Sequence, residues 1–281
     1  MFQINWKIKI FIYKILSVFK LNKILYFIQK KITRRSIVNI KELYHYWEYH
    51  AENIHKFNST KILEFGAGKS LDQNIFFNYK FDDKIEQTVI DIDNMLDFDL
   101  FNQANKKIST LIGKPKKNDV NIIGDLKNKY KIQYLAPYPI EKVKSLNLKF
   151  DLCVSSNTLE HLAVIEIKNI LLNLKEILKE GGLISFAIDY SDHFSHTDNK
   201  IGPLNFLRYQ NKNWKKYNTS YLFHNRLRHQ DYRKLFLENG YEIIDEKLGT
   251  IAEKPKNISK EFDQDNKETF ALWGLFTGKT K

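Results

Sequence analysis

The stretch KILEFGAGKS (residues 61–70) places two close glycines directly after a short apolar run. KILEF is typical of a buried strand, and Gly66 and Gly68 predict a turn in which the backbone can approach a ligand closely. Phosphate-binding loops and dinucleotide-binding loops both use glycines in this way. The residues on either side of the two glycines therefore decide which ligand the turn is built for.

Both phosphate-binding interpretations fail at specific positions. The GKS of residues 68–70 matches the end of a phosphate-binding loop, but that motif needs a glycine at position 63, where the chain has Leu63. A dinucleotide-binding loop needs a third glycine at position 71, where the chain has Leu71. In either case Glu64 would bring a carboxylate close to a phosphate, which is electrostatically unfavourable. A nicotinamide-dependent enzyme is kept as the weaker alternative.

A cationic ligand without phosphate is the third option. A carboxylate beside two glycines suits S-adenosylmethionine, which carries an ammonium and a sulfonium group. A second acid is then expected at the end of the next strand, where it would bind the two ribose hydroxyls. QTVIDID (residues 87–93) supplies Asp91, 25 residues after Gly66, with Asp93 as the weaker choice.

Strand-like runs alternate with helix-like runs along the chain. This alternation, followed by two strands with no helix between them, predicts a doubly wound α/β sheet with an antiparallel end. Ligands of such sheets bind at the carboxyl ends of the central strands. The expected strands are 61–65, 87–93, either 121–125 or 131–135, 150–156, 182–190, 241–249 and 269–278, and the expected helices are 41–57, 162–180 and 228–240.

Four segments, in this order, resemble class I S-adenosylmethionine-dependent methyltransferases: ILEFGAG, VIDIDNML, FDLCVSSNTLEHL and LKEILKEGGLISFAI. The resemblance covers roughly residues 58–281. It implies a Rossmann-like, mostly parallel, seven-stranded sheet whose last strand is antiparallel, with S-adenosylmethionine as the cofactor and methyl transfer as the activity. We therefore divide the chain into a basic, apolar, helical N-terminal arm (1–57) and a methyltransferase domain (58–281).

The resemblance also assigns residues to the cofactor. It implies that Glu64, Gly66 and Gly68 hold the methionine end and that Asp91 holds the ribose. After the third strand the chain departs from the family, because Leu-Ala stands where an acid followed by alanine is usual, and this leaves the partner of the adenine amine open. The predicted cofactor residues are Glu64, Gly66, Ala67, Gly68, Asp91, Ile92, Leu135, Ala136, Ser156 and Asn157.

The run DYSDHFSHTD (residues 189–198) follows the fifth expected strand and should lie at the mouth of the site. If the acceptor is a hydroxyl, a base must take its proton, and histidine has a suitable pKa near neutrality. His193 and His196 are the candidate bases, with His193 preferred because it is nearer the strand end. A polar loop with exposed histidines is the equally open alternative.

Glu160 and His161 follow the fourth strand, where some methyltransferases bind a divalent metal. A metal needs further ligands nearby, and Val164 and Ile165 offer none, so we expect no metal here. The basic run FHNRLRHQDYR (223–233) suits an anionic group of the acceptor or an ion pair with neighbouring acids. The predicted substrate residues are Glu160, His161, Asp189, Arg208, His224, Asn225, Arg226 and His229.

The net charge of +12 is concentrated in the N-terminal arm. Residues 1–41 carry ten lysines and arginines and no acid, which leaves a charge of +2 for the other 240 residues. A nearly neutral body argues against nucleic acid as a partner. Lysines interrupt the arm before any apolar run reaches the roughly 18–20 residues that span a bilayer. The arm is either an amphipathic helix on an anionic membrane surface or a set of helices packed on the domain.

The chain has one cysteine, Cys153, in an apolar run, which suits a reducing cytoplasm. We expect a cytoplasmic protein, located at the inner membrane face if the arm binds lipid. The predicted reaction moves a methyl group to an oxygen or nitrogen of a small-molecule or saccharide-type acceptor. The runs DYSDHFSHTD, GPLNFLRY and NRLRHQDY loosely resemble a bacterial subgroup linked with cell-envelope metabolism. A non-catalytic membrane-surface binding module on the same scaffold is a second alternative.

Overall fold

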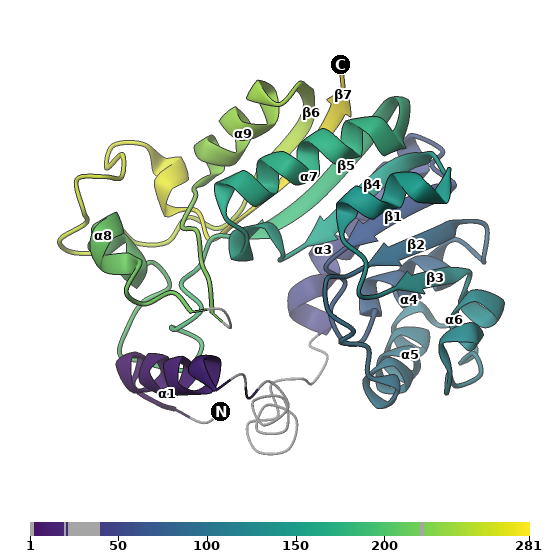
Figure 1. Cartoon of the computed structure of the whole chain (residues 1–281), viewed down its shortest axis with the longest axis horizontal. Coiled ribbons are helices and arrows are strands. Elements are labelled where there is room, and N and C mark those ends of the chain that lie inside the picture. The colour runs from purple at the N-terminus through teal and green to yellow at the C-terminus, as the bar shows by residue number, and fades with distance from the viewer. Residues whose placement is uncertain (1–2, 20, 22–39, 220–221) are drawn as a thin grey trace.

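The uninterrupted apolar runs of the sequence become the buried strands of a sheet with helices on both faces (Figure 1). The computed structural model describes residues 3–19, 21, 40–219 and 222–281. These residues form a seven-stranded sheet. Its strands, in chain order, are β1 Lys61–Phe65, β2 Glu86–Ile90, β3 Ile132–Leu135, β4 Phe150–Ser156, β5 Leu178–Asp189, β6 Tyr241–Leu248 and β7 Trp273–Thr280.

The strand order across the sheet is β3-β2-β1-β4-β5-β7-β6. The strands from β3 to β5 pair in parallel, whereas β7 runs antiparallel between β5 and β6. The prediction of a doubly wound, mostly parallel, seven-stranded sheet with an antiparallel end is therefore confirmed. The order reverses between β1 and β4, and in open α/β sheets this is where a ligand crevice forms.

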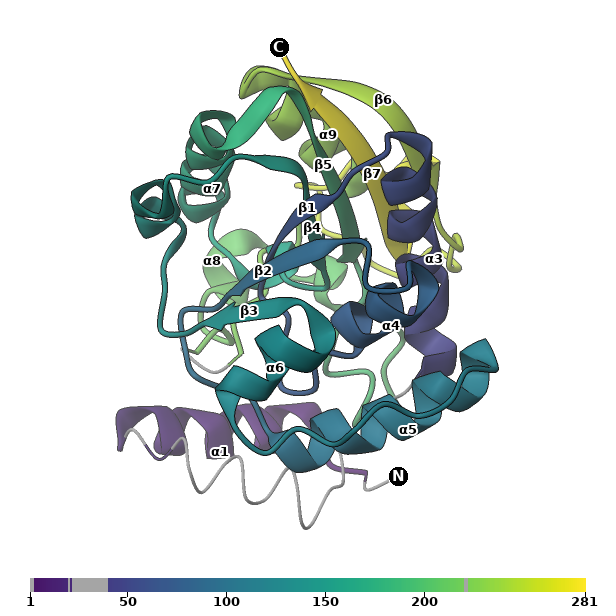
Figure 2. The same cartoon turned by 90° about the vertical axis from the view of Figure 1, so that its right-hand side faces the viewer.

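Alternation along the strands sends side chains into two apolar layers. Ile62 of β1 lies in one layer and Leu63 in the other. Figure 2 shows the helices that cover the two faces. The first layer lies under α3 Ile40–Lys56, α4 Asp72–Lys80, α5 Phe98–Ile112 and α6 Ile123–Tyr130, and the second under α7 Val164–Ile177 and α9 His229–Glu238.

The helix predicted over residues 162–180 ends earlier, at Ile177. Strand β5 begins at the next residue, where the backbone of Leu178 pairs with that of Phe150 at the start of β4 and the Leu178 side chain is buried. The register shifts before the next pair, Leu152 with Leu183, so the residues between Leu178 and Leu183 form an irregular part of the strand. Gly181 and Gly182, which follow the predicted helix directly, lie inside β5.

Three further boundaries differ from the sequence predictions. Residues 131–135 supply the third strand, whereas 121–125 lie at the start of α6. Strand β2 ends at Ile90, so Asp91 follows the strand rather than lying within it. Residues 269–270 belong to a short 3-10 helix, and β7 begins only at Trp273.

Helix α3 packs directly on the sheet through buried Trp47, Ala51 and Ile54. Its polar residues are also satisfied there, because Asn53 Nδ2 donates to Ser185 Oγ of β5 (3.0 Å) and to Thr277 Oγ1 of β7 (2.7 Å). Helix α3 is thus part of the folded body. The predicted division of the chain between residues 57 and 58 stays a prediction.

The N-terminal helix α1 Trp6–Val18 packs on the segment that follows β5 (Figure 1). The backbone N–H of Trp6 donates to Asp198 Oδ2 (3.0 Å), and Lys9 Nζ donates to Thr197 Oγ1 (3.3 Å). One face of the arm's first helix is therefore held on the body, while residues 22–39 lie outside the described residues. The apolar cluster between the two comprises Trp6, Ile10, Phe194, Leu204, Phe206, Leu207, Trp214 and Phe270.

Helix α1 also carries a second apolar face that the body does not cover. Phe11 is 65 % exposed and Phe19, just past the helix, is 67 % exposed. Within the described part of the chain, each helix is too short or too polar to cross a membrane. The exposed apolar residues of this face are Ile8, Phe11, Ile12, Ile15, Val18 and Phe19.

Candidate functional site

A cavity of about 520 Å³ lies at the carboxyl ends of β1, β2 and β4. Its walls come from the turn after β1, the segment after β2, residues 138–141, the loop after β4 and helix α7. Pockets for small ligands typically measure about 300–1,000 Å³, so the cavity has the size of a cofactor site. Its position is the one predicted from the strand order.

The two glycines of the opening motif shape this cavity in different ways. Gly66 has a φ of +72°, and a Cβ added there would lie 2.5 Å from Oγ1 and Cγ2 of Thr158, in the loop after β4. Gly68 has a φ of +71°, and a Cβ there would meet no atom within 4 Å. Gly66 therefore lets the turn after β1 approach the loop after β4, whereas Gly68 keeps space open beside the cavity.

Asp91 lines the cavity with an unused acceptor. Its side chain is only 5 % exposed, and burial raises its pKa. Oδ1 accepts a hydrogen bond from the backbone N–H of Asp93 (3.3 Å), whereas the buried Oδ2 has no hydrogen-bond partner among the described residues. A buried carboxylate oxygen without a partner is unfavourable, and a ligand hydroxyl would satisfy it. Ile92, the next residue, also lines the cavity.

The two residues predicted at the end of β4 behave differently. Asn157 lines the cavity, adopts a positive φ of 51°, and has a buried Oδ1 with no partner among the described residues. Ser156 instead donates to Gln73 Oε1 (2.7 Å) and lies 3.0 Å from Nε2 of His50. Asn157 can bind a ligand, whereas Ser156 belongs to the polar contacts under α3.

Glu64 does not line the cavity, although the sequence predicts that it holds the cofactor. Its side chain is 3 % exposed and Oε2 accepts a hydrogen bond from Asn74 Nδ2 of α4 (2.7 Å). Burial raises the pKa of Glu64 to about 8, despite that hydrogen bond. In this structure Glu64 connects β1 to α4.

The other predicted cofactor residues, Ala67, Leu135 and Ala136, pack against the apolar layers. The cavity wall near them is formed by residues that sequence reasoning missed, including Tyr138, Glu141 of the 3-10 helix Ile140–Leu146, and Asn169 of α7. No motif marks these three residues. Their position becomes evident only when the helices are placed on the sheet.

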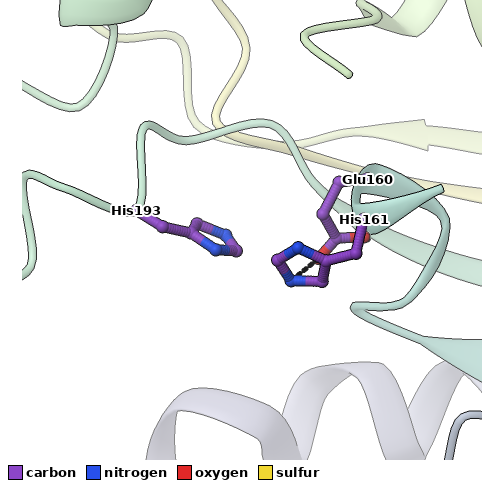
Figure 3. Close-up of side chains that lie close together, drawn as sticks. All are labelled: Glu160, His161 and His193. Atoms are coloured by element: carbon purple, nitrogen blue, oxygen red, sulfur yellow. Dashed lines mark ion pairs between the residues drawn. The ribbon is translucent and has the colours of Figure 1, made fainter. Parts of the chain in front are cut away.

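A cluster of ionisable side chains lies next to the cavity, in the loops after β4 and β5 (Figure 3). One ligand atom from each of Glu160, His161 and His193 lies within 4.8 Å of the other two. Glu160 is buried, and neither carboxylate oxygen has a hydrogen-bond partner among the described residues. His224 joins the cluster, with its ring centroid 4.8 Å from that of His193. His193 follows His161 by 32 residues in the sequence, and the parallel pairing of β4 with β5 brings the two together.

His193 and Asp189 form a hydrogen-bonded pair at the end of β5, with 3.1 Å between His193 Nε2 and Asp189 Oδ2. Burial alone would raise the pKa of Asp189, but the hydrogen bond and charge of His193, with Ser191, lower it to about 2. His196 stacks on His193 at 5.3 Å between ring centroids. Burial and the nearby His193 lower the pKa of His196. Both candidate bases thus lie together.

Three predicted substrate residues instead bind neighbouring protein groups. Asn225 Nδ2 donates to the carbonyl oxygens of Leu159 (2.8 Å) and Leu162 (2.9 Å). Arg226 Nη1 donates to the carbonyl oxygens of Phe206 (2.8 Å) and Tyr209 (2.6 Å). These contacts fix the loop before α9.

His229, the third of these residues, stacks on Phe276 at 4.3 Å between ring centroids. Its Nδ1 lies 3.1 Å from the hydroxyl of Tyr190. Arg208 is exposed at the end of the 3-10 helix Asn205–Arg208 and is not brought to the cluster. Of the eight predicted substrate residues, the structure gathers Glu160, His161, Asp189 and His224 around His193.

No family model and no curated protein sequence matches the chain. Solved structures do. Magnesium protoporphyrin IX methyltransferase from Synechocystis PCC 6803, with S-adenosylhomocysteine bound, has a TM-score of 0.51 at 10 % identity, over 97 % of this chain and 99 % of that one. N-methyltransferase NodS from Bradyrhizobium japonicum WM9 has a TM-score of 0.45 at 11 % identity, over 85 % of this chain and 96 % of that one. A structure from Nostoc punctiforme PCC 73102 has a TM-score of 0.47 at 12 % identity. The match covers 85 % of this chain, and this chain spans only 56 % of the length of that one.

The strand order with an antiparallel β7 and the near-complete overlap with the Synechocystis structure decide the fold. The chain has the class I methyltransferase fold. This outcome agrees with the resemblance carried by the four sequence segments. In the methyltransferase fold seen here, the cavity lies where the strand order reverses. Five of the ten residues predicted to bind the cofactor, Gly66, Gly68, Asp91, Ile92 and Asn157, line it, and their role in binding stays a prediction.

Proposed function

We propose that the protein is an S-adenosylmethionine-dependent methyltransferase that acts on an oxygen or nitrogen of a small-molecule or saccharide-type acceptor. The observation that carries this proposal is the cavity at the carboxyl ends of β1 and β2, where the buried Oδ2 of Asp91 has no partner among the described residues. The unpartnered oxygen suits a ribose hydroxyl, and the open space beside Gly68 suits a ligand close to the backbone.

The residues that would hold S-adenosylmethionine are Gly66, Gly68, Asp91 and Asn157. When bound, this cofactor supplies a methyl group that its sulfonium already activates, so the protein mainly has to align the acceptor. The Oδ1 of Asn157 can accept a hydrogen bond from the ligand because no described residue satisfies it.

On the acceptor side, His193 is the preferred base and His196 the second candidate. Asp189 accepts a hydrogen bond from His193 and holds the ring at the end of β5 (3.1 Å). A histidine oriented in this way can take the proton of an acceptor hydroxyl. The saccharide-type acceptor and a role in cell-envelope metabolism rest on the sequence resemblance of residues 189–198 and the runs that follow. No nucleic-acid partner is proposed, because the body is nearly neutral.

Calorimetric titration with S-adenosylhomocysteine, the product of the proposed cofactor, tests this function. We expect micromolar binding to the wild type and binding about 10- to 100-fold weaker in Asp91→Asn, since hydrogen bonds to charged groups contribute about 1.5–3 kcal/mol. Asp93→Asn is the matched control, because Asp93 lines the same cavity but is the weaker choice for the ribose. It should retain binding.

NADH and ATP serve as competing ligands in the same titration. Preference for NADH would support the nicotinamide-dependent alternative and reject the methyltransferase. That alternative is weaker because the dinucleotide-binding sheet has strand order 3-2-1-4-5-6, without the antiparallel strand inserted here. Binding of S-adenosylhomocysteine without methyl transfer to any acceptor in a cell extract would support a non-catalytic module.

We also propose a cytoplasmic location with α1 in contact with the anionic inner face of a membrane. The exposed apolar face of α1 is flanked by exposed Lys7 and Lys14 on the same side of the helix. A helix with lysines beside an apolar face suits the boundary between lipid headgroups and acyl chains. The other face of α1 stays on the body through Trp6 and Ile10.

A further inference from the structure

The cluster beside the cavity has the composition of a metal site. Glu160 offers a carboxylate oxygen, and His161 and His193 each offer a ring nitrogen, all within 4.8 Å of one another. Glu160 and His161 belong to the 3-10 helix Leu159–His161 after β4, and His193 to the loop after β5. In Figure 3 the ring of His193 faces the other two side chains across a gap. Two imidazoles with one carboxylate form a recurrent ligand set for divalent transition metals.

Two buried side chains at this point have polar atoms without partners. Both carboxylate oxygens of Glu160, which is 1 % exposed, and both ring nitrogens of His224, which is 8 % exposed, make no hydrogen bond with the described residues. Buried polar groups are normally satisfied, and each exception calls for an explanation such as a bound ion. A cation between the loops would satisfy Glu160 directly.

Hydrogen bonds from outside the cluster leave the required lone pairs free. The Nδ1 of His161 donates to the carbonyl oxygen of Phe223 (3.0 Å), because a carbonyl can only accept. A neutral His161 therefore keeps its lone pair on Nε2, which lies 4.0 Å from Oε1 of Glu160. In the same way, donation from His193 Nε2 to Asp189 leaves the lone pair of a neutral His193 on Nδ1, which is the nitrogen that would have to bind the metal. Carbonyl and carboxylate partners of this kind commonly orient metal-binding histidines.

A small cavity of about 10 Å³ lies against these residues. His161, His193 and His224 contribute to its wall. Glu160 does not line this cavity, so the cavity marks open space on the histidine side of the cluster and is not itself a preformed site for an ion. His161 also lines the larger cavity, which means that the two cavities share a wall.

We propose that the protein binds one divalent transition-metal ion, with Zn²⁺ as the reference ion, through Glu160, His161 and His193. His224 lies beside this site and contributes to its polar wall. Mg²⁺ and Ca²⁺ do not suit this site, because they prefer sites made only of oxygen ligands, whereas two of the three ligands here are histidine nitrogens. The local argument against a metal, that no further ligand follows His161 in the sequence, does not hold once β5 brings His193 beside it.

Three protein ligands leave positions open on the metal, as in catalytic rather than structural zinc sites. In a step that rests on the proposed function, we infer that an oxygen or nitrogen atom of the acceptor takes such a position. His193 would then act as a ligand that Asp189 orients, and the base role would fall to His196. The preferred acceptor class is accordingly a compound with a metal-binding oxygen or nitrogen at the methylated position.

Zn²⁺ titration of the metal-free, full-length protein by calorimetry tests the site. We expect one equivalent to bind the wild type, and at least about tenfold weaker binding in Glu160→Gln and in His193→Asn, because each loses one ligand. His55→Gln is the matched control, since His55 is an exposed histidine of α3 outside the cluster, and it should bind as the wild type does. MgCl₂ should give no comparable binding.

Folding of each variant is followed by far-UV circular dichroism, and the melting temperature of the wild type should rise with Zn²⁺. If Glu160→Gln does not fold, His193→Asn carries the comparison. The proposal is overturned if the wild type binds no stoichiometric Zn²⁺, if both cluster variants bind it as tightly as the wild type, or if His55→Gln loses as much affinity. Titration with S-adenosylhomocysteine separates the two ideas: its failure rejects the proposed function, and failure of Zn²⁺ binding rejects the metal site.

Discussion

Gly66 combines a left-handed backbone conformation with a close neighbour. Its φ is +72°, and an added Cβ would lie 2.5 Å from two side-chain atoms of Thr158. Alanine at this position should therefore lower stability for two reasons. The left-handed conformation costs about 1–2 kcal/mol, and the collision with Thr158 costs about 1–3 kcal/mol. We expect Gly66→Ala to lower the free energy of unfolding in urea and to weaken S-adenosylhomocysteine binding.

Gly68→Ala is the matched control for this prediction. Its φ of +71° is nearly the same, but its Cβ would meet nothing within 4 Å, so only the conformational part remains. Adding Thr158→Ala to Gly66→Ala removes both contacting atoms and should recover part of the lost stability, a coupling that a double-mutant cycle measures. Equal losses at Gly66 and Gly68, with no recovery, would show that Thr158 does not constrain the turn.

Single residues show where reasoning from the sequence succeeds. The position of Gly66, Gly68 and Asp91 at the cavity was predictable, because a turn after a strand and an acid after the next strand meet at one edge of a parallel sheet. Glu64 was not, because side chains alternate along a strand, and a carboxylate within a strand can point to the helix layer instead of the ligand. Arg226 was predicted to bind substrate, but its guanidinium donates to backbone carbonyl groups instead. An arginine in the sequence does not show which of these two partners it has.

At the level of elements, the hydrophobic pattern predicted the presence of strands better than their limits. Helix α5 was not predicted, although Asp97 caps its first turn and Gly113 follows its end in the left-handed conformation. The end of α7 was wrong by three residues, because pairing of Leu178 in the sheet overrides the local helical pattern. The approach of His193 to His161 could have been predicted, since β4 and β5 are parallel neighbours whose following loops share an edge.

The exposed face of α1 predicts binding to anionic lipid. We expect the full-length protein to sediment with vesicles that contain phosphatidylserine, and less so at high salt, because charge attraction is screened. Phe11→Asp should strongly reduce sedimentation, since Phe11 is 65 % exposed and flanked by Lys7 and Lys14. Leu172→Asp is the control, because Leu172 is 55 % exposed on α7. The membrane contact is rejected if the wild type does not sediment with the vesicles, or if Phe11→Asp sediments as much as the wild type does.

Across the whole molecule, buried ionisable groups make stability depend on pH in opposite directions. Burial lowers the pKa of His50 from 6.5 to about 3. Below pH 6.5 the unfolded chain therefore binds a proton at this histidine that the folded protein does not bind, and stability falls as the pH drops. Burial raises the pKa of Glu64 from 4.5 to about 8 and that of Asp72 from 3.8 to about 6. Here the folded protein keeps protons that the unfolded chain releases, so stability falls as the pH rises.

Of these three groups, Glu64 has the pKa that is raised furthest into the neutral range, to about 8. Between pH 6.5 and about 8 we expect the carboxyl of Glu64 to contribute a fall in the free energy of unfolding in urea with rising pH, by at most about 1.4 kcal/mol per pH unit, alongside the contributions of other buried ionisable groups such as Glu160 and His161. Glu64→Gln should remove this contribution and make the slope more positive than that of the wild type, because the amide keeps an acceptor for Asn74 but does not ionise. Glu86→Gln, at the exposed start of β2, should keep the slope of the wild type. Equal slopes for the wild type and Glu64→Gln would mean that Glu64 is ionised in the folded protein, and the carboxyl between β1 and α4 would then need a cationic partner.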